Sequence, residues 1–244
     1  MNRYHAFGWH LLISAAIGAA LLGLCWFVWY PAPMLMALGG HEIFLLIVGI
    51  DVVVGPLLTL VVFNPAKRSL KFDLAVIALL QISAAVYGVS TILEARPAYI
   101  ASLGDAFHVV QATEVTDENL RKANTTLPWW GPKLVGTKNE IDKDLKSLVS
   151  DLVAIGAGKG HVPQLHVPYD SVRNQVAKDA MSIADMKTRT DTKPEEIDKW
   201  LAAHNRDGLS AKYQAIKIGP NYYAIVLDAK TGAIVGTTSF KLNM

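Results

Sequence analysis

The sequence contains a single cysteine, Cys25, and it lies inside an apolar segment. The rest of the chain therefore holds no disulfide bond and no thiol chemistry, which neither requires nor excludes export. Runs of basic residues are also absent from the C-terminal part, where acidic and basic side chains are almost evenly mixed. Because a protein that grips phosphates needs a basic patch, we expect no nucleic-acid partner.

Motifs of catalysis and metal binding are missing as well. The chain has no G-x-S-x-G, no phosphate-binding glycine loop and no H-E-x-x-H. His161 and His166 share one loop, but their spacing is not typical of a metal site and no cysteine lies near them. We therefore expect no enzymatic activity, no cofactor and no metal site.

Charge is scarce before Glu94, where the only charged residues are Arg3, Glu42, Asp51, Lys67, Arg68, Lys71 and Asp73. Three apolar stretches fill this part, at about 7–30, 43–63 and 74–93, each near the ~20 residues that cross a bilayer core. Soluble helices seldom run so far without a charged face. We predict a membrane domain with three transmembrane helices at 1–96, followed by a soluble domain at 97–244, whose size of about 150 residues is normal for one domain.

The first apolar stretch reads as an uncleaved anchor. A cleaved signal peptide has a shorter apolar core and small residues at its exit. Here the exit carries Trp26, Trp29 and Tyr30, which are typical of the aromatic belt at a membrane surface.

Lysine and arginine predict the orientation. The loop 64–73 carries Lys67, Arg68 and Lys71, whereas the loop 31–42 carries no basic residue. The positive-inside rule then places the N-terminus and the basic loop in the cytoplasm. The C-terminal domain faces outward, which for a bacterial inner-membrane protein means the periplasm.

The domain 97–244 shows both strand and helix patterns. Strand-like runs lie at 98–103, 107–112, 213–218, 222–228 and 233–240, with a bulged hairpin turn at Asp228–Gly232. Helices are predicted at 116–124, after a Thr137/Glu140 capping box, from Asp170, and after a Thr192/Glu195 capping box. Residues 127–136 are predicted to form a loop. The predicted fold class is membrane-anchored α+β, with helices covering an antiparallel sheet in the periplasmic domain.

Asp51 is the sharpest single feature of the apolar part. It lies about 18 Å deep, near the bilayer midplane, where an ionised carboxylate costs on the order of 3 kcal/mol, so it should face the helix bundle. Pro56 removes one backbone hydrogen bond and leaves the carbonyl of Val52 short of a donor. Tyr87 lies at about the depth of Asp51 and Ser83 about half a turn nearer the cytoplasm. Gln81 is roughly a full turn too shallow, although its side chain is long enough to close part of that gap. We predict a structural clamp made by Asp51, Pro56, Ser83 and Tyr87; a proton path and a partner contact are the alternatives.

Two further features invite a partner. Ala15, Ala19 and Gly23 form a ridge of small residues along the first span, which suits packing against the chain's own spans or docking of a foreign helix. Trp129 and Trp130 lie in a proline-bounded loop and are read as core residues, membrane-surface anchors or partner contacts.

Several distinctive runs lie in roughly the first 110 residues: His10-Leu-Leu-Ile-Ser14, Trp29-Tyr-Pro31, Gly49-Ile-Asp-Val-Val-Val-Gly-Pro-Leu-Leu-Thr59, Asn64–Asp73, the span around Gln81, Tyr87-Gly88 and Ala95-Arg-Pro97. Together these runs resemble the type IV pilin accessory proteins, the TfpX/TfpZ group that includes FimB. Further on, the similarity is looser and rests on the Trp129-Trp130 loop and the final hairpin.

The resemblance implies a chaperone-like inner-membrane factor, and no enzyme, that helps the major pilin reach the assembly machinery. Its implied partners are the major pilin, the pilus assembly machinery and the lipid bilayer. On this view the candidate pilin-docking residues are Ala15, Ala19, Gly23, Trp29, Trp129 and Trp130. The family supplies no catalytic residue to carry over.

A membrane-anchored, periplasmic ligand-sensing or binding module is the alternative function. Helices that cover an antiparallel sheet outside the membrane fit it equally well. Its weakness is that the cytoplasmic segments, 1–6 and 64–73, are too short for a signalling domain.

Overall fold

The computed structural model describes residues 2–243, which form two compact units. The membrane unit comprises the chain up to Pro31 together with Gly39–Ala95. The sheet unit comprises Ala32–Leu38 together with the chain from Arg96 onward. The segment Ala32–Leu38, which we expected in the membrane domain, therefore belongs with the sheet unit, where Leu38 lies beside Gly219.

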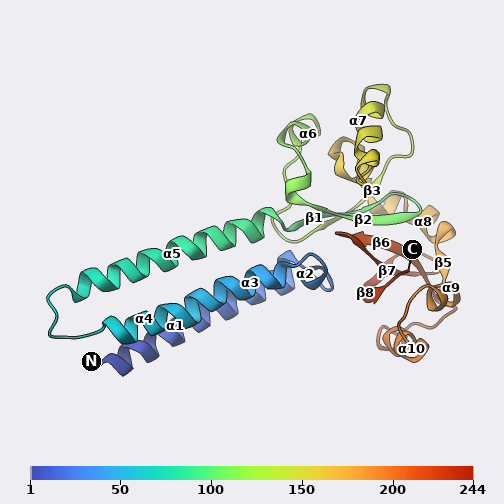
Figure 1. Cartoon of the computed structure of the whole chain (residues 1–244). Helices are drawn as coiled ribbons and strands as arrows, with labels where there is room; N and C mark the ends of the chain where they lie inside the picture. The colour runs from blue at the N-terminus through green and yellow to red at the C-terminus, as the bar shows by residue number, and fades with distance from the viewer. Residues whose placement is uncertain (1, 244) are drawn as a thin grey trace. The chain divides into compact units, whose positions relative to one another are not determined.

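The membrane unit is built from three long apolar helices (Figure 1). The first is α1 (Arg3–Leu24), which continues as the π-helix η1 (Cys25–Trp29). The second is α3 (Gly40–Val48), the π-helix η2 (Gly49–Val54) and α4 (Gly55–Val62), and the third is α5 (Leu70–Glu94). Each is long and apolar enough to cross a membrane, as predicted, and each begins three or four residues earlier than the apolar pattern suggested.

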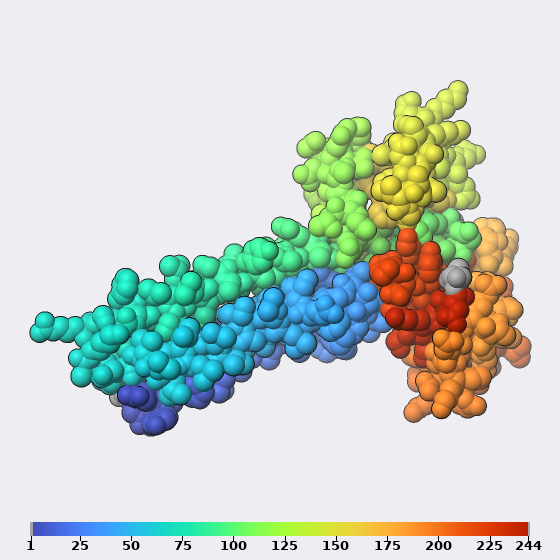
Figure 2. Space-filling view, viewed as in Figure 1, coloured from blue at the N-terminus to red at the C-terminus, as the bar shows by residue number. Residues whose placement is uncertain are grey.

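Most large apolar side chains of the membrane unit point away from its interior. Phe27 is 81% exposed, Val61 77% and Leu79 65%. Figure 2 shows α5 lying along α3 and α4 on the face that it presents. An exposed apolar surface of this extent is not compatible with water, so it marks the lipid-facing side of a membrane protein.

The sheet unit contains one eight-stranded sheet in the order β4-β3-β1-β2-β6-β7-β8, with β5 paired to β6. Its strands are β1 (Pro97–Ser102), β2 (Ala106–Gln111), β3 (Lys133–Thr137), β4 (His166–Pro168), β5 (Met181–Ser182), β6 (Ala211–Ile218), β7 (Asn221–Asp228) and β8 (Ile234–Lys241). The pairs β1–β3 and β2–β6 are parallel, and the other pairs are antiparallel. The α+β class is confirmed, but the sheet is mixed, because two pairings join strands that are not consecutive in the chain.

Short helices surround this sheet. They are α2 (Met34–Ala37), α6 (Asp117–Lys122), α7 (Lys143–Ala154), α8 (Arg173–Asp179), α9 (Ile183–Thr188) and α10 (Pro194–Ala203), with 3₁₀ turns η3 (Ala112–Glu114), η4 (Lys159–His161), η5 (Pro163–Leu165) and η6 (Tyr169–Ser171). In Figure 2, α6 and α7 stand out as two separate projections of the sheet unit.

Apolar clusters hold the helices of the sheet unit in place. In one, Ile183 and Met186 of α9 and Ile197 and Leu201 of α10 pack on alternate residues of β6 and β7. Another joins α6, through Leu120, to β1, β2 and β3. A further cluster, around Val149, holds α7 and contains no strand residue. Alternate side chains of a strand face one side of a sheet, so the cluster on β6 and β7 follows a period-two pattern.

Local signals mispredicted several helix starts. Thr137 ends β3 rather than capping a helix, and α7 begins only at Lys143. Helix α10 is preceded by Lys193, not by Thr192. Asp170 lies in a 3₁₀ turn ahead of α8, and the predicted loop 127–136 contains the start of β3. Capping boxes form instead between Ser182 and Asp185, at the start of α9, and between Gln111 and Glu114, at η3.

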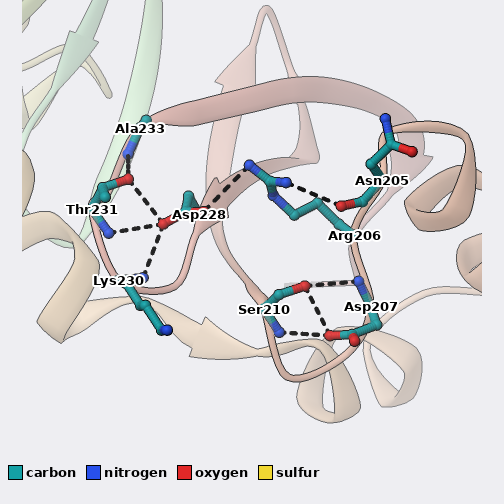
Figure 3. A network of polar contacts seen from close by, with 8 residues as sticks. All are labelled: Asn205, Arg206, Asp207, Ser210, Asp228, Lys230, Thr231 and Ala233. Carbon is teal, nitrogen blue, oxygen red and sulfur yellow. Dashed lines mark hydrogen bonds and ion pairs between the residues drawn. The ribbon is translucent and has the colours of Figure 1, made fainter.

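Asp228 organises the predicted turn between β7 and β8 (Figure 3). Its Oδ1 accepts hydrogen bonds from the N–H of Lys230 at 3.1 Å and from the N–H and Oγ1 of Thr231, both at 2.9 Å. Its Oδ2 lies 3.3 Å from Nη2 of Arg206, in the loop after α10. Gly232 closes the turn at φ 68°, where a side chain would also overlap the backbone of Arg173.

We predict that Asp228→Ala destabilises the sheet unit by about 1–3 kcal/mol, because it leaves the turn without its acceptor and Arg206 without its partner. The measurement is thermal or urea unfolding of the detergent-purified chain. Lys230→Ala is the control, because Lys230 contributes only its backbone N–H to this network.

The pH dependence of that difference follows from the same bonds. Hydrogen bonds from Thr231 lower the pKa of Asp228 below its usual value. The stabilisation is therefore complete above the unfolded-state pKa of about 3.9 and is lost as the pH falls through the lower, folded-state value. A wild-type advantage that persisted unchanged at pH 2 would contradict this explanation.

Candidate functional site

Three hydrogen bonds join the three spans of the membrane unit in pairs. Nδ1 of His10 in α1 lies 2.7 Å from Oγ1 of Thr59 in α4. Nε2 of Gln81 in α5 donates to the backbone carbonyl of Asp51 at 3.1 Å. The hydroxyl of Tyr30, just after η1, donates to the carbonyl of Ile92 in α5 at 2.7 Å. Each pair of spans is thus connected by at least one polar contact in a largely apolar interior.

The π-helix η2 explains why Gln81 bonds to this particular carbonyl. In η2 the N–H of Gly55 bonds to the carbonyl of Ile50, five residues back. The next donor in that register is Pro56, which has no N–H, so the carbonyl of Asp51 is left without its helical partner. The side chain of Gln81 supplies the missing donor. From the sequence we predicted that the carbonyl of Val52 would lack a donor, because we assumed α-helical spacing.

Two glycines allow the spans to approach this closely. A Cβ on Gly55 would overlap the side chain of Gln81, and a Cβ on Gly88 would overlap Ile47 of the second span. Gly55 therefore opens the space through which Gln81 reaches the backbone.

The structure brings only part of the predicted clamp together. Asp51 and buried Pro56 lie at the contact with α5, but the partner there is Gln81. Ser83 is exposed, and Tyr87 is 75% exposed. At about 100° per residue, Ser83 and Tyr87 lie roughly 200° and 240° around α5 from Gln81. The prediction matched depth and overlooked helix phase, and the long side chain of Gln81 covers the difference in depth.

A cleft of about 210 Å³ opens between α1 and α5. Both helices pack mainly on the second span, which forms the floor of the cleft. Its lining is apolar except for His10, Ser14, Asp51 and Gln81. Oδ1 of Asp51 is buried and has no hydrogen-bond partner among the described residues.

The small-residue ridge lies on a different side of α1. Ala15 and Ala19 are exposed and Gly23 is half-buried, with open space around its Cα. The chain's own spans pack instead against Ser14 and Gly18. The ridge is therefore left to lipid or to another protein. Trp29, predicted beside it as a docking residue, is only 4% exposed and belongs to the unit's interior.

The two tryptophans of the sheet unit are surface residues. Trp129 is 54% exposed and Trp130 76% exposed, so they are not core residues. The guanidinium of buried Arg96 lies 5.8 Å from the ring centroid of Trp129 and donates to the carbonyl of Pro128 at 3.1 Å. Trp129 is thus held in place, and Trp130 presents most of its ring to the outside.

The basic loop between α4 and α5 is also exposed. Arg68 and Lys71 lie on its surface, and Lys67 pairs with Asp73 at 2.6 Å. Apart from the ion pair of Lys67, no contact among the described residues explains why this loop is basic, and its role in orientation stays a prediction.

The sheet unit has a polar cavity of about 330 Å³, lined by His108, Glu114, His161 and Lys217 among others. Burial, with nearby Lys217 and His161, lowers the pKa of His108 to about 4, so its ring is neutral at neutral pH. Burial raises the pKa of Glu114, but hydrogen bonds from His161 and the Gln111 N–H outweigh it and bring the pKa below its usual value. Lys217 donates to the carbonyl of Gly156 at 2.5 Å.

Among these four groups, Nε2 of His161 lies 3.6 Å from a carboxyl oxygen of Glu114, and Lys217 is close enough to act electrostatically on Glu114 and His108. Within residues 2–243, no group of three or more His, Cys, Asp or Glu side chains is placed to hold a metal ion.

Comparison with known proteins connects both units to a family. The chain is 30% identical over 194 residues to the fimbrial assembly proteins of serogroups I and E1 of Dichelobacter nodosus, covering 78% of this chain and 76% of each relative. This chain belongs to the fimbrial assembly protein family. A third relative, the fimbrial assembly protein of serogroups C1 and C2, is 38% identical over 118 residues, covering 48% of this chain and 90% of its own length.

Membership of the fimbrial assembly protein family confirms the resemblance to type IV pilin accessory proteins that the N-terminal runs indicated. The similarity extends beyond the membrane unit, because the 194 aligned residues exceed its length. No family model matches the chain, and no solved structure matches it.

We predict that Gln81→Leu destabilises the membrane unit by about 0.5–2 kcal/mol, since it leaves the carbonyl of Asp51 without a donor in an apolar surrounding. Ser83→Leu is the matched control: it lies two residues away and faces outward, so it should be neutral. Thermal unfolding of the purified chain in detergent measures both. Equal unfolding temperatures for Gln81→Leu and the wild type would show that this bond does not hold the spans together.

Proposed function

We propose that this chain is a non-catalytic, chaperone-like factor of type IV pilus assembly that assists the major pilin in the inner membrane. Membership of a family of fimbrial assembly proteins is the observation that carries a role in pilus assembly. The three membrane-spanning helices support a place in the membrane. The pilin-assisting role is our own extension of these two observations.

The division into two units suits a pilin as the client. A pilin waiting in the membrane is an apolar helix with a head outside the bilayer. The membrane unit offers lipid-exposed apolar helix faces to such a helix. The sheet unit offers Trp129 and Trp130, aromatic residues of the kind enriched at protein interfaces. In our proposal, a transient complex with pilin, absent from the finished pilus, uses both the lipid-exposed helix faces and these two tryptophans.

In the membrane, α1 is our proposed surface for the pilin helix. One of its faces carries the ridge of Ala15, Ala19 and Gly23, whose small side chains permit close approach. Another face borders the cleft that contains Asp51. We propose the pilus assembly machinery as a second partner, which would contact a lipid-exposed face of the membrane unit.

The decisive experiment is deletion of the gene in a piliated strain, combined with purification of the tagged chain from detergent-solubilised membranes. Loss of surface pili, together with copurification of unassembled pilin, supports the proposal. Normal piliation and no copurified pilin would refute it.

We predict the topology from the basic loop. Reporter fusions at Ser69 should be active in the cytoplasm, and fusions after Ile100 should be active in the periplasm, because Lys67, Arg68 and Lys71 hold their loop on the cytoplasmic side. Periplasmic activity at Ser69 would overturn this orientation, and with it the proposed meeting of the sheet unit with a pilin head.

For the sheet unit, we predict that Trp130→Ala reduces copurified pilin severalfold at unchanged protein level, because an exposed indole contributes strongly to interfaces. Leu209→Ala is the control, since Leu209 is 92% exposed and should not affect pilin binding. Trp129→Ala is less informative, because Trp129 also packs against Arg96. Undiminished pilin with Trp130→Ala would exclude this residue from the contact.

A further inference from the structure

The cleft between α1 and α5 contains a buried polar atom that surrounding lipid cannot hydrogen-bond. Its walls and floor are apolar, yet Oδ1 of Asp51 is buried in it without a hydrogen-bond partner among the described residues. A buried acceptor near the middle of a membrane span is unfavourable unless a donor reaches it. Acyl chains carry no donor, so lipid cannot complete this site.

Only one oxygen of the Asp51 carboxyl group lacks a partner. Gln81 donates to the backbone carbonyl of Asp51, and its amide also contacts the Asp51 carboxyl group. Oδ1 itself has no hydrogen-bond partner among the described residues. His10 lines the same cleft, but its Nδ1 is directed to Thr59.

The dimensions of the cleft suit a helix. On α1 its wall runs from His10 to Leu21, about 16 Å or three helical turns. On α5, exposed Ala78 and half-buried Ala85 are small and allow a backbone to come close, whereas Ser14 and Gly18 of α1 lie at the base of the cleft against the second span. The large residues Ile17 and Ile82 flank the opening. They are 55% and 63% exposed, so both side chains are available to pack against a docked helix.

We propose that this cleft, and not the ridge of Ala15, Ala19 and Gly23, is the docking site for the transmembrane helix of the pilin, with the carboxyl group of Asp51 accepting a hydrogen bond from a donor side chain on that helix. This inference rests on the proposed function. The occupant is a helix because only a helix brings a donor to this depth with its own backbone satisfied.

Two residues of α1 give a matched crosslinking test. Ile17 borders the cleft, and Ala19 lies on the ridge two residues later, at nearly the same depth but about 200° around the helix. With a photo-crosslinking residue at either position, in membranes of a pilin-producing strain, pilin should be captured from Ile17 and not from Ala19. A photo-crosslinker at Ile82, on the opposite wall, should also capture pilin.

Other outcomes overturn the proposal. Capture of pilin from Ala19 alone makes the ridge the dock. A product of twice this chain's mass from Ile17 means that a second copy fills the cleft. Absence of any protein product from both Ile17 and Ile82 means that lipid fills it.

Substitutions test the same point without a probe. Ala78→Leu fills the cleft from α5, and Ala19→Leu adds the same bulk to the ridge. Both residues are exposed, so neither change disturbs the unit's own packing. We expect copurified pilin to fall about fivefold or more with Ala78→Leu and to stay unchanged with Ala19→Leu. The reverse result contradicts the cleft.

The polar contact is tested at Asp51 itself. Asp51→Asn keeps an acceptor oxygen and should retain pilin, whereas Asp51→Leu removes it and should reduce copurified pilin about fivefold. Chain abundance and unfolding temperature are measured for both variants. Full copurification with Asp51→Leu would remove the hydrogen bond from the proposal.

The proposed function and the proposed docking site in the cleft can be refuted separately. If the wild-type chain copurifies no pilin and its deletion leaves piliation intact, the proposed function is wrong. If pilin copurifies but Ile17, Ile82 and Ala78→Leu all give negative results, the function stands and only the cleft is wrong.

Discussion

The membrane unit depends on one constraint: in an apolar medium every backbone polar group needs a partner within the protein. Pro56 and the π-helix η2 together break that rule at the carbonyl of Asp51, and Gln81 of α5 restores it. The carbonyl left unpaired in the second span thereby becomes the acceptor of the hydrogen bond that joins this span to α5. Gly55 makes the bond possible, because any side chain there would overlap Gln81. The second span is consequently the member on which the other two are assembled.

The packing of α1 and α5 on the second span also creates the cleft that contains Asp51. Because α1 and α5 both pack mainly on the second span, a cleft separates them. Gln81 donates to the backbone carbonyl of Asp51, and the carboxyl oxygen Oδ1 of Asp51 has no hydrogen-bond partner among the described residues. Such a site suits the role that we propose, because a single hydrogen bond in lipid is selective without being strong.

The sheet unit follows the physics of water-soluble proteins. An apolar cluster on alternate residues of β6 and β7 holds α9 and α10, and the turn between β7 and β8 is held by the short polar side chains of Asp228 and Thr231. Its polar cavity contains groups that satisfy each other, among them Glu114 and His161. A ligand-sensing module would use such a cavity, but the family to which the chain belongs favours pilus assembly over sensing.

The sequence by itself determined the three spans, the α+β class, the hairpin turn at Asp228–Gly232 and the family, because each depends on a local pattern of apolar residues, turn residues or matching runs. It also predicted Asp51 as a residue that needs a partner. Only the tertiary structure decided which residue that partner is, since Gln81, Ser83 and Tyr87 differ in the side of α5 they occupy, and a count of depth does not reveal helix phase. The parallel pairs β1–β3 and β2–β6, and the burial of Trp29, were likewise decided by contacts between distant segments, for which no local pattern exists.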